Sequence, residues 1–358
     1  MSDRPKVSVV IPTFKRAHLI GCVFEALTKQ TCNDFEVLVV LKPSGDNTEN
    51  IVKYFEKFLK IKLIFQNKGY IVDALNIGFD YATGDIIAFL DDDAVPYEDW
   101  VEKHVESYER YENVGGVAGN VIPARLCGDK LVKVGGYVSH VIPSFRRLTF
   151  LESVFRSVWN VPLEGMEDYL VYISKAGVVE YNLNVSRFAW NKPVKSLLGM
   201  GANMSVLREA VEGFRFPSQW VLGLAWEQFL GWHLWKKGYN LIFNPKASVY
   251  HIVQSESLTR NVRSAKKDLL RWVENYLLFY RLYGLEPKLS RMHRITWLIF
   301  SSLVSLKKLC KDKEFQQIVR LKGRLYSELI GQKWLLSKNI GGNYSPLTEL
   351  NALWKSQR

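Results

Sequence analysis

The fold of this chain is decided by the stretch Ile86-Ile87-Ala88-Phe89-Leu90-Asp91-Asp92-Asp93. Its apolar half is typical of a buried strand. Because residues two apart in a strand point to the same side, Asp91 and Asp93 are predicted to project together from the strand's carboxyl end, the edge where open α/β sheets bind ligands. Two carboxylates suit Mg²⁺ or Mn²⁺. The alternative is a solvated turn, but mutual repulsion among three adjacent acids favours a site.

Strand-like and helix-like segments alternate around this stretch. Strands are expected at 7–11, 35–41, 61–65, 86–90 and about 241–250, and helices at about 19–27, 51–59, 70–82 and 98–111. Pro12 is expected to end the first strand, and Asp46 or Asn47 to cap the second helix. This order predicts an α/β fold with a doubly wound, mostly parallel sheet. The mixed pattern of 114–200 predicts no definite order.

The net charge of +12 is unevenly distributed. Residues 259–358 contain 20 Lys and Arg against 7 Asp and Glu, whereas residues 1–258 are nearly neutral. We therefore expect a catalytic domain at 1–258 and a basic helical region at 259–358.

The basic region contains its most hydrophobic run at 295–306, flanked by Arg291 and Arg294 before it and by Lys307 and Lys308 after it. The run is shorter than the roughly 20 residues that span a bilayer. An apolar face edged by cations is typical of a helix that lies on anionic lipid. The alternative is a helical cap with a solvated basic surface. Nucleic acid is not an expected partner, because no known binding module is present.

The N-terminus lacks the long apolar core of a signal peptide, and the four cysteines show neither paired nor metal-ligand spacing. We therefore expect a cytoplasmic protein with reduced thiols, peripheral at the inner face of the cell membrane.

Six segments in order resemble the inverting family-2 glycosyltransferases of the GT-A fold, which carry a DxD motif. The segments are Val9–Phe14, Asn67-x-Gly69 with Asn76-x-Gly78, Gly84–Pro96, Gly201–Met204, Glu227 followed by Gly238-Tyr239, and Asn244–His251. The resemblance covers about residues 5–255. It implies a donor-binding half at about 1–115 and an acceptor half at 116–258.

The resemblance also implies roles for individual residues. Donor binding is implied for Pro12, Thr13, Phe14, Asp46, Asn67, Gly69, Asn76, Asp91 and Asp92. Metal binding is implied for Asp91 and Asp93, with His251 completing the ligands. Acceptor binding is implied for Gly201, Asn203 and Trp226, and the role of catalytic base for Glu227.

The chain departs from the family pattern at three positions. Leu41 stands where the family usually has an Asp that reads the base, and Leu75 where an Arg often precedes the donor-loop Asn. The usual acidic pair at the base position reads Glu227-Gln228, with Glu227 at the catalytic position. The sequence therefore does not predict the nucleotide base.

The expected function is transfer of a sugar from a UDP- or GDP-linked donor to a glycan acceptor, expected to be lipid-linked, with Mg²⁺ or Mn²⁺ as cofactor. One alternative is a nucleotidyltransferase, although no Gly- and Lys-rich phosphate loop follows the first strand. The other is a non-catalytic scaffold of a glycan-assembly complex.

Overall fold

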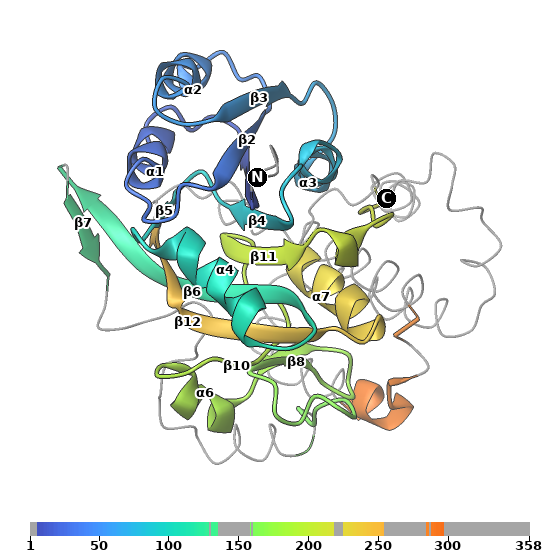
Figure 1. The fold of residues 1–358 in the computed structure, drawn as a ribbon. Helices are drawn as coiled ribbons and strands as arrows, with labels where there is room; N and C mark the ends of the chain where they lie inside the picture. Colours follow the sequence, from blue (N-terminus) through green and yellow to red (C-terminus); the bar gives the residue numbers. More distant parts are fainter. Residues whose placement is uncertain are drawn as a thin grey trace, which may run out of the picture.

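The structure is a computed structural model that describes residues 6–128, 130–134, 158, 160–217, 225–253, 284–285 and 288–296. Its main element is a ten-stranded sheet with the order β10-β12-β6-β11-β4-β1-β2-β3, to which β5 and β7 are added beside β12 and β6 (Figure 1). The strands are β1 (Val7–Thr13), β2 (Phe35–Leu41), β3 (Ile61–Phe65), β4 (Ile86–Leu90), β5 (Ala94–Pro96), β6 (Val114–Cys127), β7 (Lys130–Lys133), β10 (Val194–Lys195), β11 (Asn203–Leu207) and β12 (Asn240–Ile252). A separate two-stranded sheet pairs β8 (Val171–Ile173) with β9 (Val179–Tyr181).

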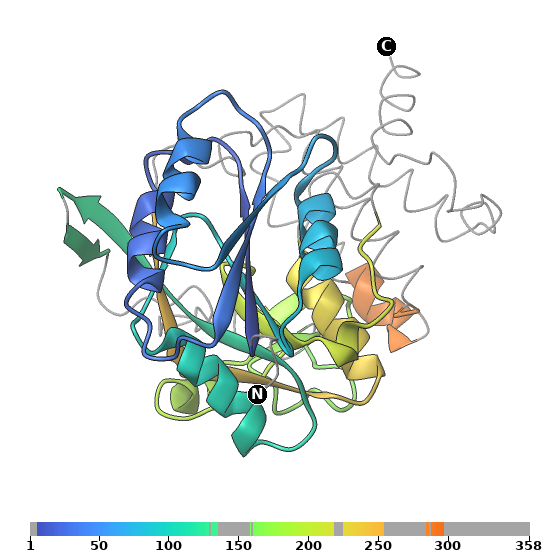
Figure 2. The same ribbon diagram turned by 45° about the horizontal axis from the view of Figure 1, so that its top comes forward.

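Helices cover both faces of the large sheet. They are α1 (Ile20–Leu27), α2 (Thr48–Phe55), α3 (Ile71–Tyr81), α4 (Trp100–Arg110), α6 (Leu183–Ala189) and α7 (Trp226–Lys236). Figure 2 shows α1, α2 and α4 on one side of the strands and α3 and α7 on the other. The sheet is therefore doubly wound, as predicted, and the pairs β1–β2, β2–β3, β1–β4 and β6–β12 are parallel.

Strands β2, β3 and β4 have the predicted bounds, but β1 does not end at Pro12. Thr13 continues the strand, and its carbonyl accepts a hydrogen bond from the Lys42 amide on the β2 side at 3.0 Å. Alternate residues of a parallel strand bond to opposite neighbours, so Pro12 faces β4. Pairing with β4 has already ended at Val10, and the missing amide hydrogen of proline therefore breaks no ladder bond.

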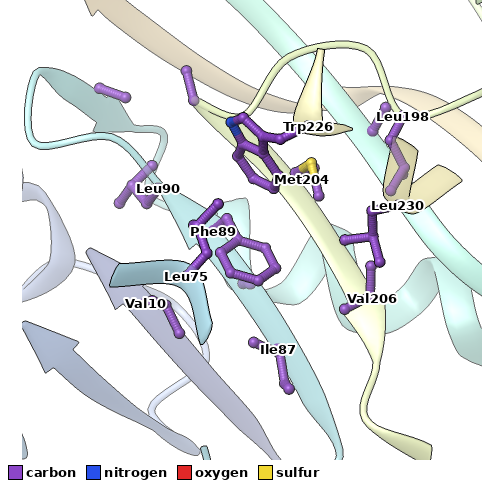
Figure 3. Close-up of a cluster of buried hydrophobic side chains, with 14 of the residues drawn as sticks. Val10, Leu75, Ile87, Phe89, Leu90, Leu198, Met204, Val206, Trp226 and Leu230 are labelled. Atoms are coloured by element: carbon purple, nitrogen blue, oxygen red, sulfur yellow. The ribbon is translucent and has the colours of Figure 1, made fainter. Parts of the chain in front are cut away.

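β11 lies inside the sheet and runs antiparallel to both β4 and β6. It follows the 114–200 stretch and was not predicted as a strand, although its first residues belong to the segment Gly201–Met204 that resembles the family. Its side chains alternate between the two faces, and Met204 and Val206 contribute to the core beside Trp226 and Leu230 of α7 (Figure 3). This strand therefore joins α7 to β4.

On the other face of β11, Asn203 is completely buried and fully hydrogen-bonded. Its amide nitrogen donates to the Asn120 carbonyl at 2.9 Å and to the Ala247 carbonyl at 2.8 Å. Its amide oxygen accepts from the Trp100 indole at 2.8 Å and from His104 Nε2 at 3.0 Å. A single side chain thus connects β11 to β6, β12 and α4.

His104 is held in its neutral form within this network. Burial lowers the pKa of His104 to about 4. Because Nε2 donates to Asn203, the unprotonated Nδ1 accepts from the Ser205 hydroxyl at 2.8 Å. Gly119 makes room for the network, since a Cβ there would lie 2.3 Å from Asn203 Nδ2. The polar core therefore fixes α4 against the sheet.

The predicted basic region at 259–358 lies mostly outside the described residues. Residues 291–296 are helical, and Leu285 and Leu289 are buried. Most of the apolar run at 295–306 falls outside the described part. Within the described ranges, no helix has the length and apolar character needed to cross a membrane. The division at 258 stays a prediction.

We predict that Asn203→Ala destabilises the protein by about 2–4 kcal/mol, because Trp100, His104 and two carbonyls would each lose a buried partner. Urea unfolding measures the change, and Asn184→Ala at an exposed position is the matched control, expected within about 0.5 kcal/mol of the native chain. Equal stability of the two variants would show that the network contributes little.

Candidate active site

The ends of several strands meet directly after β4. Asp91, Asp92 and Asp93 follow Leu90, and β5 then pairs antiparallel with β12, placing Ala94 opposite His251. The Ile252 amide donates to the Asp93 carbonyl at 2.9 Å. This pairing brings β12, which is distant in the sequence, beside the acids.

Asp91, Asp93 and His251 form a compact group of potential metal ligands. One ligand atom from each lies within 4.8 Å of the others, and His251 Nε2 is 3.2 Å from Asp93 Oδ1. Two carboxylates and an imidazole fit Mn²⁺ or another divalent cation that accepts oxygen and nitrogen ligands. The three residues predicted to bind metal are therefore brought together.

Arg16, which the sequence analysis missed, is the principal cation beside the acids. Its Nε donates to Asp92 Oδ1 at 3.2 Å, and its Nη2 lies 3.6 Å from Asp93 Oδ2. Its side chain is only 11% exposed. A usable signal was its position just after β1, because parallel neighbours such as β1 and β4 end at the same edge.

The pKa of Asp93 differs from the pKa values of Asp91 and Asp92. Burial and the charge of Asp93 raise the pKa of Asp91 to about 7 and that of Asp92 to about 7. Burial also acts to raise the pKa of Asp93, but the hydrogen bond from His251 and the charges of His251 and Arg16 hold it below its ordinary value. Asp93 is therefore the acid most firmly ionised before any cation binds, and a bound cation would favour the ionised form of Asp91 as well.

Glu227 lies in the first turn of α7, near enough to Asp91 for their charges to interact. Its Oε1 accepts a hydrogen bond from the Gly201 amide at 2.9 Å, and burial raises its pKa to about 7. The charge of Glu227 contributes to the raised pKa of Asp91. The predicted base and the predicted metal ligands therefore share one electrostatic environment. A carboxylate with a pKa near neutrality is suited to accept a proton.

The structure assigns Trp226 to packing rather than to acceptor contact. The ring is 7% exposed, packs edge-on against Phe89 at a centroid distance of 5.5 Å, and contacts Phe216 at 5.7 Å. It leaves no room for a side chain at Gly201, where a Cβ would be 2.3 Å from the indole. Gly201 thus serves the site through its amide, which positions Glu227.

The acceptor contact predicted for Asn203 is also corrected. All hydrogen-bonding positions of its amide are used within the core, and its exposure is 0%. Tyr181 of β9, which the sequence analysis did not single out, lies close enough to Glu227 for their charges to interact. Tyr181 is partly exposed, and burial followed by the charge of Glu227 raises its pKa.

On the donor side, Phe14 lies among cations at the end of β1. Lys15 Nζ is 5.3 Å and Lys42 Nζ 5.8 Å from the centre of the Phe14 ring. Lys42 also donates to the Gly69 carbonyl at 2.8 Å and lies 5.8 Å from the Tyr70 ring. Phe14 and Gly69 are thus brought together as predicted, through a lysine that the sequence analysis did not identify.

Asp46 and Asn67 are placed differently from each other. The Asp46 carboxylate accepts hydrogen bonds from the Ser44 hydroxyl at 2.8 Å, the Thr48 hydroxyl at 2.9 Å and the Ala17 amide at 3.2 Å. It therefore holds the turn before α2 against the loop after β1. Asn67 is exposed. Pro12 and Thr13 form the end of β1, as described above.

Asn76 lies inside α3 and not in a donor loop. Its amide makes two 2.8 Å hydrogen bonds to the backbone amide and carbonyl of Phe216. Gly78 is required for packing, because a Cβ there would approach Val10 to 2.5 Å. The second half of the predicted donor loop is therefore structural, and it anchors the chain shortly before α7.

Comparisons with known proteins agree with this geometry. Residues 8–132 match the family model described as Glycosyl transferase family 2. Chondroitin synthase of Escherichia coli is 37% identical over 111 residues, which are 30% of this chain and 16% of that protein. Glycosyltransferase AglE of Haloferax volcanii is 32% identical over 158 residues, 43% of this chain and 49% of AglE. The chain thus matches less than half of the length of either relative.

Among solved structures, that of GalNAc-T7 with UDP, GalNAc and Mn²⁺ superimposes with a TM-score of 0.53 at 15% identity, covering 75% of this chain and 48% of GalNAc-T7. This similarity supports the GT-A fold for the sheet and its helices. The family match and the structural similarity therefore show that residues 8–132, which include the acids after β4, resemble glycosyl transferase family 2 and that the sheet with its helices has the GT-A fold.

Proposed function

We propose that the protein is a metal-dependent, inverting glycosyltransferase that uses a nucleotide-sugar donor. One observation carries the proposal: a divalent-cation ligand set and a carboxylate base lie at the same edge of the sheet, and the charge of Glu227 acts on Asp91. A metal site alone would fit many enzymes. A metal site that faces a half-buried base fits transfer to a hydroxyl group.

In the proposed reaction, the acceptor hydroxyl attacks the anomeric carbon of the donor sugar. Its oxygen forms the new glycosidic bond while the bond from that carbon to the diphosphate oxygen breaks, and the electron pair leaves with the nucleoside diphosphate. Glu227 takes the hydroxyl proton. Its raised pKa and its hydrogen bond from Gly201 keep this carboxylate basic and oriented. A single displacement of this kind inverts the anomeric configuration.

The proposed metal ligands are Asp91, Asp93 and His251. When bound, Mg²⁺ or Mn²⁺ would supply positive charge to the leaving diphosphate. Asp92 accepts a hydrogen bond from Arg16, so it is proposed to contribute negative charge beside the metal ligands without binding the metal itself. The 1–115 half would bind the donor, with Phe14 and Gly69 on the nucleotide side.

The donor is proposed to be linked to UDP or GDP. The similarity to a structure that contains UDP, GalNAc and Mn²⁺, and to proteins described as glycosyltransferases, supports this class of donor. The acceptor is proposed to be a lipid-linked glycan. The basic composition of 259–358 supports a peripheral position on an anionic membrane at its cytoplasmic face.

Asp93→Asn should lower metal-dependent donor turnover by about 100-fold or more, because the most ionised of the acids would be lost. Release of nucleoside diphosphate from a panel of UDP- and GDP-sugars with Mn²⁺ measures this. Asp34→Asn, at an exposed position, is the control and should leave turnover unchanged. Full activity of Asp93→Asn would contradict the role given to Asp93, whereas absence of both turnover and metal-dependent nucleotide binding in the native chain would favour the scaffold hypothesis.

Glu227→Gln should lower kcat by about 10²–10⁴-fold, because glutamine retains the shape but accepts no proton. In the native chain, kcat should rise with pH through about 7, since the base works only when ionised and its pKa is about 7. A pH series with saturating Mn²⁺ tests both points, with Glu212→Gln on the surface as control.

The product of the same reaction also shows whether the anomeric configuration is inverted. Proton NMR of the native product should show an anomeric configuration opposite to that of the donor. A product with the donor's configuration, or a Glu227→Gln variant with native kcat, would contradict a single displacement with this base.

The full chain should bind vesicles that contain anionic lipid at low salt and be released as salt rises, because cation attraction to lipid is screened. Sedimentation with phosphatidylserine-containing and purely zwitterionic vesicles measures the difference. Equal partition onto both kinds of vesicle, or onto neither, would argue that 259–358 caps the domain.

A further inference from the structure

Arg16 is held close to the metal ligands by the backbone as well as by its side chain. It follows Lys15, which has a left-handed φ of 58°, and its carbonyl accepts from the Leu19 amide at 3.0 Å and the Ile20 amide at 3.0 Å at the start of α1. The guanidinium is therefore fixed on the loop that joins β1, on the nucleotide side, to α1. Its partners are on the next strand, after β4.

Each carboxylate oxygen of Asp93 lies near a side-chain nitrogen of a different residue. Oδ1 is 3.2 Å from His251 Nε2, and Oδ2 is 3.6 Å from Arg16 Nη2. A cation bound by Asp93 would therefore share the carboxylate with the guanidinium. Two positive charges near one carboxylate repel each other, and the repulsion is substantial where water is partly excluded.

The donor brings the charge that would relieve this repulsion. Its diphosphate would be anionic and, in the proposed function, would lie between the cation and the loop after β1. We propose that Arg16 is a built-in counterion: it neutralises Asp92 and Asp93 in the free enzyme, weakens the binding of a cation alone, and thereby couples cation binding to donor binding. The inference rests on the proposed function and deepens it.

The coupling has a defined thermodynamic signature. If the nucleotide strengthens cation binding by some factor, the cation strengthens nucleotide binding by the same factor. Removing Arg16 should strengthen binding of the cation alone and reduce this factor. A purely structural Arg16, which only orders the acids, makes the opposite prediction, because disordered ligands would bind the cation more weakly.

The experiment compares the native full chain with Arg16→Met by electron paramagnetic resonance of free Mn²⁺ at pH 8, with and without UDP or GDP. We expect Arg16→Met to bind Mn²⁺ alone roughly tenfold more tightly, and the enhancement by nucleotide to shrink by a similar factor. Lys29→Met removes an exposed positive charge just after α1, at a residue without a role in the site, and should change Mn²⁺ affinity by less than about twofold.

Unchanged or weaker Mn²⁺ binding by Arg16→Met would overturn the inference while leaving the proposed function intact. Mn²⁺ binding that is absent in the native chain, or that survives Asp93→Asn, would overturn both. The two failures are therefore distinguishable within one set of titrations, and neither readout depends on turnover.

A charge-matched pair keeps the test valid if Arg16→Met alone does not fold. Asp92 is the closer partner of Arg16, so Arg16→Met combined with Asp92→Asn removes one charge of each sign. Comparison of this double variant with Asp92→Asn isolates the effect of Arg16. The double variant should again bind Mn²⁺ alone roughly tenfold more tightly than Asp92→Asn. Equal Mn²⁺ affinities of the double variant and of Asp92→Asn would contradict the proposal that Arg16 acts as a counterion.

Discussion

Negative charge at the end of β4 is the constraint on which the rest of the site depends. Burial raises the pKa values of Asp91, Asp92 and Glu227 to about 7, and the charge of Asp93 adds to the rise for Asp91 and Asp92. Such crowding costs folding free energy unless opposite charge is near. Arg16 and His251 supply that charge in the free protein. Under the proposed function, a divalent cation and a donor would complete the compensation, so the same electrostatic repulsion that costs folding free energy would favour the binding of both.

The sheet positions these groups because successive side chains along each strand point to opposite faces. Along β11, one set of side chains enters the polar network around Asn203 and α4, and the other set packs against α7 (Figure 3). The same strand begins next to Gly201, whose amide holds Glu227. Glu227, the proposed base, is therefore connected to the proposed metal ligands through a strand with both faces packed. This rigidity matters because a catalytic carboxylate displaced by about 1 Å can lose much of its effect.

Much of the architecture was readable from the sequence, since continuous apolar runs such as 35–41 and 86–90 have few alternatives to buried strands. The acids after β4, Glu227 and His251 could be singled out from the sequence because each follows, begins or lies in a predictable element, and their roles stay predictions. Asn203, Trp226 and Asn76 were misassigned for a common reason: a polar or aromatic residue in a functional-looking segment can equally serve the core, and only its partners distinguish the two. Arg16 was missed although its position just after β1 was a usable signal, whereas Lys42 and Tyr181 were missed because their neighbours, Gly69 and Glu227, are distant in the sequence.

The central claim is that Asp91, Asp93 and His251 hold one divalent cation beside Glu227. The most direct measurement is a crystal structure of the full chain with Mn²⁺ and UDP or GDP, with the ion located by anomalous scattering at the manganese absorption edge. The account predicts a single strong peak within coordination distance of Asp93, Asp91 and His251, and in contact with the diphosphate. A peak bound elsewhere, or nucleotide bound in this cleft with no manganese beside Asp93, would contradict it.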